Sequence, residues 1–402
     1  MTTRLLQNAL SFSRLPFRYK PWKPTHLRIL ISDFRGKEKQ PRHSDDKHLA
    51  SVIAWLCLAQ DQRIGQSDEG GVSAGWSFED GWLPSYPETS GYIVETFLAA
   101  STLLNDSDLK NRAQRIIDWE LSIQNEDGSF PGHFGERGSK PVIFNTGQIM
   151  HGMISGFEHL QNSECLEAAV RAGQWMIQQQ DDDGCWRRSV HNNTPHTYNT
   201  RAAWALLKTG LAANDKKLVK AANKNINWAL AQQTDNGWFK NNAFVPNTPP
   251  FTHTIAYAIR GILESGLLLG DSKMIDAAVK AAISQAEKQR NDGWLAGTYD
   301  EWWEPQSRYC CLTGLAQMCL IWFRIARAVG DASLEESAKK GINYIKSNHR
   351  IVGTEITQKG GLTGSSPIWG RYSMFEYPNW AAKFFADALM MNMDNISIPN
   401  YR

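Results

Sequence analysis

Gln124-Asn125-Glu126-Asp127-Gly128-Ser129-Phe130 is a short phrase that this chain repeats at regular intervals. Clear copies follow at residues 180–186, 233–239 and 289–295, a looser copy stands at 79–82, and a degenerate one stands at 359–362. The turn glycines Gly128, Gly184, Gly237 and Gly293 are 56, 53 and 56 residues apart. A fixed period of this length indicates a repeat architecture.

Each repeat predicts a helical hairpin. Asp-Gly or Asn-Gly accepts positive φ and ends a helix, and an amphipathic helix precedes each phrase while a more apolar helix follows it. We expect outer helices at 47–62, 107–124, 163–180, 215–233, 271–289 and 331–348. We expect inner helices, apolar nearly all round, at 88–104, 145–161, 198–213, 253–269, 308–329 and 378–392. The sequence therefore predicts an all-α fold, an (α/α)6 toroid of six hairpins.

The predicted ring occupies residues 46–394 as one domain, although 402 residues would by length alone suggest two or three. Residues 1–45 form an N-terminal extension that carries four prolines and has a basic second half. It is expected to be a strap across the ring or an arm that binds a partner. The weakly amphipathic stretch 5–15 fits packing on the domain better than contact with a membrane surface. Residues 395–402 are a C-terminal tail.

Composition limits the classes of function. Charged residues are 21% of the chain and the net charge is +2, which gives no bulk electrostatic case for nucleic acid or an anionic membrane. No apolar run is long enough for an integral membrane segment, and the N-terminus lacks a secretory signal. None of the six cysteines forms a Cys-x-x-Cys pair, which favours a reducing compartment. We expect a cytoplasmic protein.

The Gln-x-x-Asp-Gly-aromatic phrase resembles the repeats of squalene cyclases and protein prenyltransferases, and also those of six-hairpin glycosidases and other glycan-active toroids. The resemblance covers roughly residues 47 to 392 and implies the α/α ring. The segment 361–370, which continues to Tyr377-Pro378-Asn379-Trp380, is similar to proteins associated with bacterial polysaccharide clusters. That likeness implies a carbohydrate ligand and possible polysaccharide-assembly protein partners.

Terpenoid and metal chemistry are less well supported. A terpenoid cyclase of this type needs an Asp-x-Asp-Asp acid, whereas Asp181-Asp182-Asp183 lies inside the repeat phrase, where capping a helix end is the simpler role. The Asp/Cys/His zinc set of prenyltransferases is missing, and Cys310-Cys311 lacks the Cys-His neighbour of toroidal zinc cyclases. Buried helix cysteines are the simpler interpretation. We expect no metal and no cofactor, and keep a terpenoid-cyclase-like enzyme as an alternative.

The chemistry is expected where the six inner helices begin, because in an α/α ring these starts surround one mouth. The candidate catalytic residues are Glu88, His253, Arg308, Tyr309, Asn199 and Glu301. The candidate substrate-binding residues are Tyr86, Trp76, Trp82, Asn145, Gln148, Trp186, Tyr198, Arg201, Trp238, Trp294, Trp302, Trp303, Trp369, Tyr377 and Asn379. Aromatic faces stack on sugars, and arginines and amides bind hydroxyls and carboxylates. An oligo- or polysaccharide containing a uronic acid is the predicted ligand.

Three functions stay open at this stage. A glycoside hydrolase would use Glu88 with a second carboxylate, for which the loop of Glu301 is the richest source. A polysaccharide lyase or uronyl C5-epimerase would use a His or Tyr base beside Arg and Asn that neutralise a carboxylate; Asn199, His253, Arg308 and Tyr309 resemble the sets of toroidal lyases. A non-catalytic glycan-binding scaffold is the third.

Overall fold

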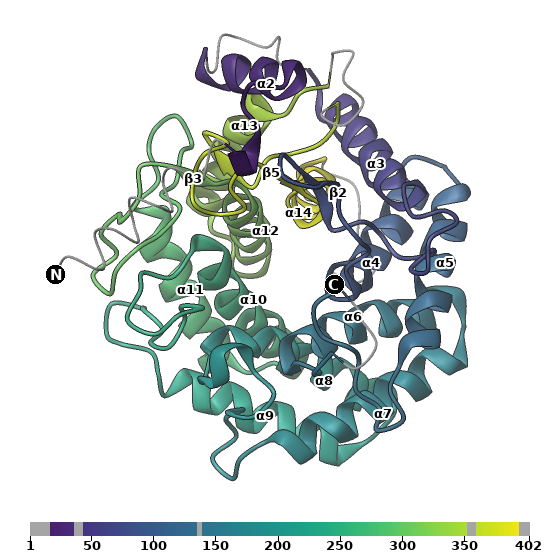
Figure 1. The fold of residues 1–402 in the computed structure, drawn as a ribbon. Helices are drawn as coiled ribbons and strands as arrows, with labels where there is room; N and C mark the ends of the chain where they lie inside the picture. The colour runs from purple at the N-terminus through teal and green to yellow at the C-terminus, as the bar shows by residue number, and fades with distance from the viewer. Residues whose placement is uncertain (1–16, 36–42, 135–138, 352–358, 394–402) are drawn as a thin grey trace, which may run out of the picture.

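The computed structural model describes residues 17–35, 43–134, 139–351 and 359–393. Twelve of the described helices form two concentric rings (Figure 1). The inner ring consists of α4 (Pro87–Leu103), α6 (Ile143–Leu160), α8 (Thr200–Ala212), α10 (Thr252–Leu269), α12 (Leu312–Val329) and α14 (Asn379–Asn392). The outer ring consists of α3 (Asp45–Asp61), α5 (Asp108–Ile123), α7 (Ser163–Gln179), α9 (Lys216–Leu230), α11 (Ser272–Ala286) and α13 (Ala332–Asn348). The predicted six hairpins are confirmed, with boundaries that shift by a few residues.

The repeated phrase is a clamp between neighbouring hairpins. Gln124 Nε2 donates to the Gly128 carbonyl of its own turn at 2.9 Å and to the Ala168 carbonyl of the next outer helix at 2.9 Å. Gln180, Gln233 and Gln289 make the same two bonds in their repeats. Two separate constraints require glycine in this turn. Gly128 has φ +88°, which other residues rarely adopt, and a Cβ there would lie 2.5 Å from the Arg171 carbonyl oxygen.

The first copy of this clamp is not at residues 79–82, where the sequence placed it. Gln60, at the end of α3, bonds the Gly70 and Arg112 carbonyls, and Gly70 is the glycine that packs on α5. In the sixth repeat His349 replaces glutamine and bonds the Gly360 carbonyl at 2.9 Å. A Cβ on Gly360 would meet Ser51 of α3, so the last clamp closes on the first outer helix.

The ring is closed at the level of both helices and loops. Each inner helix packs on its neighbours in order, and α14 packs on α4 as well as α12. In the loops, strand β1 (Gly75–Ser77) pairs with β2 (Gly81–Trp82) and with β5 (Glu376–Pro378), so the first and last repeats share one sheet. A second sheet pairs β3 (Cys310–Cys311) with β4 (Ser365–Ser366). Ring closure, which the sequence left as an expectation, is thus confirmed.

The inner helices are less apolar than expected, and this corrects the sequence prediction. Buried ion pairs lie between them, for example Lys208 with Glu95 at 3.1 Å and Arg324 with Glu264 at 3.1 Å. Lys383 and Asp387 pair within α14, fully buried. A buried charge costs less when it is paired, and the converging helices supply partners both from different repeats and from within one helix.

The described part of the N-terminal extension contains a helix, α2 (Pro24–Phe34), which lies on the ring beside the last hairpin (Figure 1). The stretch 5–15 and the tail 395–402 lie outside the described residues. Helix α12 is long and apolar enough to cross a membrane by length and composition, but 78% of it is buried inside the structure, as for a core helix of the ring.

Candidate functional site

A cavity of about 350 Å³ opens where the inner helices begin. Aromatic rings make up most of its wall, with one carboxyl group, two imidazoles and one guanidinium among them. Its lining residues are Tyr86, Glu88, Thr89, Tyr92, Phe144, His191, Phe244, Phe251, His253, Tyr257, Arg371, Tyr372, Ser373 and Trp380. Residues from 86 to 380 therefore meet in one place because the ring closes.

Glu88 is the only carboxyl group in that lining, and it is 8% exposed in the first turn of α4. The Tyr86 hydroxyl donates to Glu88 Oε2 at 2.8 Å, and Asn145 Nδ2 donates to the same hydroxyl at 3.3 Å. Burial raises the pKa of Glu88 from 4.5 to about 7, although the Tyr86 hydrogen bond and the charge of Arg201 act in the opposite direction. The carboxyl can therefore give or take a proton near neutral pH.

His253 stands in the first turn of α10 and is held as a neutral imidazole. Gln317 Nε2 lies 2.6 Å from His253 Nδ1. An amide nitrogen can only donate, so Nδ1 accepts and the ring proton is on Nε2. Burial, together with the charge of Arg201, lowers the pKa of His253 to about 3. This histidine is a hydrogen-bond donor and a poor base.

Arg201 lies beneath the cavity instead of lining it. The guanidinium is 1% exposed, and its Nε donates to Gln148 Oε1 at 2.7 Å. Four aromatic rings, those of Tyr92, Trp204, Tyr257 and Phe384, surround it at 5.3–5.9 Å. Its buried positive charge acts on both Glu88 and His253 from below. The predicted contact of Arg201 with a ligand is thus replaced by an electrostatic role.

The sequence missed much of the aromatic wall. Tyr92 and Tyr257 follow Glu88 and His253 by four residues, which places each pair on one helix face. That spacing was a usable signal. Tyr372 comes from the loop before β5; its ring lies 5.0 Å from that of His253, and its hydroxyl accepts a bond from Trp380 Nε1 at 2.9 Å. Nothing in the local sequence of this loop indicates that it folds back over the mouth.

Tyr86, Glu88 and His253 are the predicted residues that do line the cavity. Asn145 and Gln148 do not line the cavity, but each forms a hydrogen bond to a residue at or beneath its wall. Asn145 donates to the Tyr86 hydroxyl, and Gln148 accepts from Arg201. Tyr198 and Asn199 are buried outside the lining, and Tyr198 packs edge-on against Phe144 at 5.3 Å. Asn379 bonds Thr89 Oγ1 at 2.9 Å, while Tyr377 is held in β5 opposite Trp76. These last four lie outside the lining, so the structure does not bring them to the cavity surface as expected.

The structure places the predicted tryptophans outside the cavity lining, and several of them pack loops onto helix ends. Trp186 is fully buried with its Nε1 bonded to the Met176 carbonyl, and Trp303 bonds the Asn236 carbonyl. Trp76 packs on His26 and Phe78, and Trp82 packs on Trp55. Trp369 is 40% exposed and outside the cavity lining.

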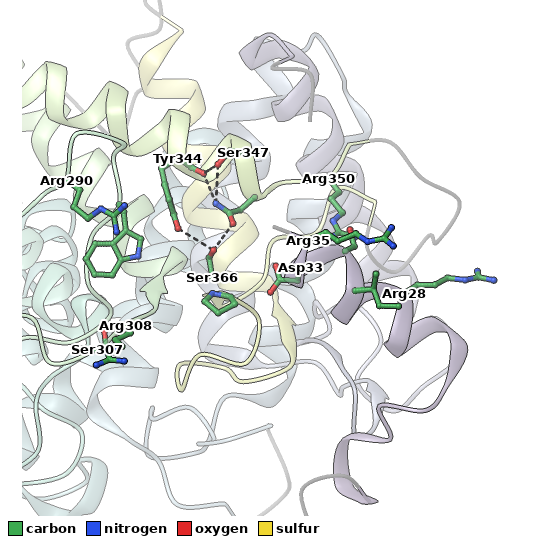
Figure 2. A pocket seen from close by; sticks show the side chains of 15 residues that line it. Arg28, Asp33, Arg35, Arg290, Ser307, Arg308, Tyr344, Ser347, Arg350 and Ser366 are labelled. Carbon is green, nitrogen blue, oxygen red and sulfur yellow. Dashed lines mark hydrogen bonds between the residues drawn. The ribbon is translucent and has the colours of Figure 1, made fainter. Parts of the chain in front are cut away.

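Other candidates belong to different surfaces. Glu301, Trp302 and Trp238 line a separate groove, so Glu301 is not a second carboxylate for Glu88. Arg308 and Trp294 line a third cleft, shown in Figure 2. Tyr309 packs against Gly297 and Gly370.

The acidic run of the repeat phrase is also away from the cavity. Asp181 and Asp183 bond Arg187 at 2.9 and 2.7 Å on an exposed turn, and Asp183 accepts from the Cys185 amide. Among the described residues, no group of three or more His, Cys, Asp or Glu side chains could hold a metal ion.

Comparison with known proteins gives the same architecture. Residues 79–264 match the family model of the squalene-hopene cyclase C-terminal domain. No curated protein matches the sequence. Among solved structures, a sugar epimerase from a ruminal bacterium is similar over 88% of this chain and 99% of its own, with 14% identity and a TM-score of 0.70.

Two hydrolases have the same shape. An unsaturated glucuronyl hydrolase specific for heparin is similar over 87% of this chain and 96% of its own, with 13% identity and a TM-score of 0.70. The unsaturated glucuronyl hydrolase of Bacillus sp. GL1 is similar over 87% and 97%, with 12% identity and a TM-score of 0.68. At such identities the likeness shows the fold alone. The chain thus has the fold of an α/α toroid, with a sugar epimerase and glucuronyl hydrolases as structural neighbours.

Proposed function

We propose that this protein is a carbohydrate-active enzyme that transfers a proton on a sugar held in the central cavity. The observation that carries the proposal is Glu88, a buried carboxyl with a pKa of about 7 inside a wall of aromatic rings. Aromatic faces stack on the apolar face of a pyranose. A volume of about 350 Å³ is near the lower end of ligand pockets, which fits one or two sugar units at the end of an oligosaccharide.

Glu88 is the proposed acid or base. His253 has too low a pKa to accept a proton near neutral pH, so its Nε2–H is assigned to a hydrogen bond with a sugar oxygen. This differs from the lyase or epimerase alternative drawn from sequence, in which a His or Tyr base acts beside Arg308 and Asn199. Arg371, which is exposed at the mouth, is the proposed partner for a carboxylate if the sugar is a uronic acid.

The reaction class that we favour is epimerisation or eliminative cleavage. Hydrolysis by paired carboxylates needs two carboxyl groups on either side of the glycosidic bond. The described lining holds one, and Glu301 lies in another groove. A single carboxyl can serve both reactions if it takes the proton from carbon and then gives it back. In elimination the leaving oxygen receives that proton, and in epimerisation the opposite face of the planar intermediate receives it. The sugar epimerase and glucuronyl hydrolases with this fold are compatible with such a substrate class.

Incubation of the protein in D₂O with reducing disaccharides and with uronic-acid oligosaccharides tests the proposal. Epimerisation introduces carbon-bound deuterium, detectable by NMR and mass spectrometry, because the carbon regains its hydrogen from solvent. Elimination instead produces an ultraviolet-absorbing double bond at that carbon. Hydrolysis by paired carboxylates would give only new reducing ends. Glu88→Gln is expected to abolish exchange with the fold intact. Binding of oligosaccharides without any conversion would instead support the non-catalytic scaffold.

A terpenoid-cyclase-like enzyme is the second candidate, because the family match and the aromatic wall both favour it. Its weakness is the acid: protonating an alkene needs a strong acid, whereas the pKa of Glu88 is raised to about 7. Asp181-Asp182-Asp183, the one acidic run that resembles the cyclase motif, lies on a surface turn. Conversion of an isoprenoid substrate by the wild type, lost in Glu88→Gln, would favour this candidate over the sugar enzyme.

A further inference from the structure

Helix α2 and the segment before it expose an unusual amount of apolar surface. Among the described residues fifteen large apolar side chains are exposed, and five of them lie between residues 17 and 34. They are Phe17, Trp22, Leu27, Ile31 and Phe34, of which Phe34 is 81% exposed. Leu27, Ile31 and Phe34 follow at intervals of four and three, so they form one row along α2. We call these five residues the apolar row.

The opposite face of α2 fixes the helix to the ring. Ile29 is buried, and the His26 ring stacks on Phe78 at 4.2 Å. Asp33 Oδ2 accepts a hydrogen bond from the Ile368 amide at 2.6 Å. Lys20 Nζ donates to the Glu79 carbonyl at 2.9 Å, just before the helix. The apolar row is therefore held outward by a rigid support.

An arginine-rich cleft of about 740 Å³ adjoins the same helix (Figure 2). Five arginines line it: Arg28, Arg35, Arg290, Arg308 and Arg350. Asp33 is the one carboxylate among the lining residues, and Ile31 of the apolar row also belongs to the lining. The whole chain has a net charge of only +2, so this positive charge is concentrated locally.

The floor of the cleft consists of hydroxyl and amide groups that already bond one another. Ser366 Oγ donates to Asn348 Oδ1 at 2.7 Å, and Asn348 Nδ2 donates to the Tyr344 carbonyl at 2.8 Å (Figure 2). A floor of this kind keeps its shape without a ligand. Arginine forks above it match phosphate oxygens, since a guanidinium donates two parallel bonds.

We propose that the apolar row and the arginine-rich cleft together form a docking surface for an anionic phospholipid membrane. Aromatic and aliphatic side chains of the row enter the headgroup layer while arginines of the cleft contact lipid phosphates, as in interfacial amphipathic helices. A soluble glycan or a free phosphate would use the arginines but would leave the row in water. A lipid surface uses both features at once.

Vesicle cosedimentation of the full chain tests this surface. The wild type is expected to bind vesicles of phosphatidylcholine and phosphatidylglycerol, and to bind phosphatidylcholine alone much more weakly. Arg35→Gln combined with Arg350→Gln removes two charges and should weaken binding about 30-fold. Leu27→Ser combined with Ile31→Ser and Phe34→Ser should weaken it at least about tenfold.

Leu211→Ser combined with Leu268→Ser is the matched control, because both side chains are exposed on the ring far from α2 in sequence. Its vesicle binding should equal that of the wild type, and circular dichroism should show all variants folded. Equal affinity for neutral and anionic vesicles would overturn the proposal, as would full binding by the variant without the row. A wild-type dimer that this variant converts to monomer, with no vesicle binding, would assign the row to a protein contact instead.

Discussion

Replacing Glu88 by glutamine should stabilise the protein, and by an amount that depends on pH. Folding raises the pKa of this carboxyl from 4.5 to about 7, so ionised Glu88 costs about 3 kcal/mol above pH 7. The folded state holds more protons than the unfolded state between these values. The contribution of Glu88 to stability is therefore complete below pH 4.5 and is lost as the pH rises through 7. Glutamine has no such dependence and still accepts the Tyr86 hydrogen bond.

The measurement is urea unfolding of wild type and Glu88→Gln from pH 5.5 to 8.5. Their difference in unfolding free energy should grow in favour of the variant by about 2 kcal/mol over this range. All other groups titrate alike in both proteins and cancel. Glu301→Gln, which removes an exposed carboxylate from another groove, is the control and should show a constant difference. A flat difference for Glu88→Gln would refute the raised pKa and, with it, the proposed acid or base.

Three further substitutions probe the site and its frame. His253→Phe should lower turnover about 100-fold through loss of one hydrogen-bond donor. The pH profile of kcat should keep its limb near 7, and a lost limb would return the base role to this histidine. Arg308→Gln should leave kcat and KM within about twofold, because Arg308 lines another cleft; a severe kinetic defect would place it at the reacting sugar. Gly314→Ala should cost about 1–3 kcal/mol in chemical unfolding, since its Cβ would lie 2.6 Å from His253 N. Gly270→Asn, at a left-handed position with open space, should cost far less.

The ring could be predicted from sequence because the residues that define each hairpin lie close together in the chain and recur in every repeat. A glutamine before each turn and a glycine within it recur with every hairpin, and both act between neighbouring repeats. The first clamp was misplaced because Gln60 and Gly70 are ten residues apart, whereas the regular copies separate these two residues by four. The period of a repeat can be read from a sequence. An insertion inside one copy, however, hides which glycine packs on the next outer helix.

The cavity was predictable only where a residue sits at a helix start. Glu88 and His253 occupy the first turns of α4 and α10, and the geometry of a closed ring places such positions at the mouth. The tryptophans failed because a loop can direct its side chains inward or onto its own helix ends, and Trp186 does the latter. The presence of a tryptophan in a loop does not show which role it has. Packing of the loop onto the protein and stacking on a ligand both favour a large aromatic side chain.

Two opposing effects determine whether Glu88 is protonated in the cavity. Six helix starts around one mouth and a buried Arg201 beneath it all favour a negative charge, and would by themselves lower the pKa of a carboxyl. The raised pKa of Glu88 therefore means that burial outweighs them, and that Arg201 keeps the value from rising further. A bound uronate would add a like charge beside Glu88 and favour its protonated form, whereas a neutral sugar would leave it near its midpoint. Arg371, the proposed partner of that carboxylate, would offset the like charge, so Glu88 is expected to keep its role as a base toward both kinds of sugar.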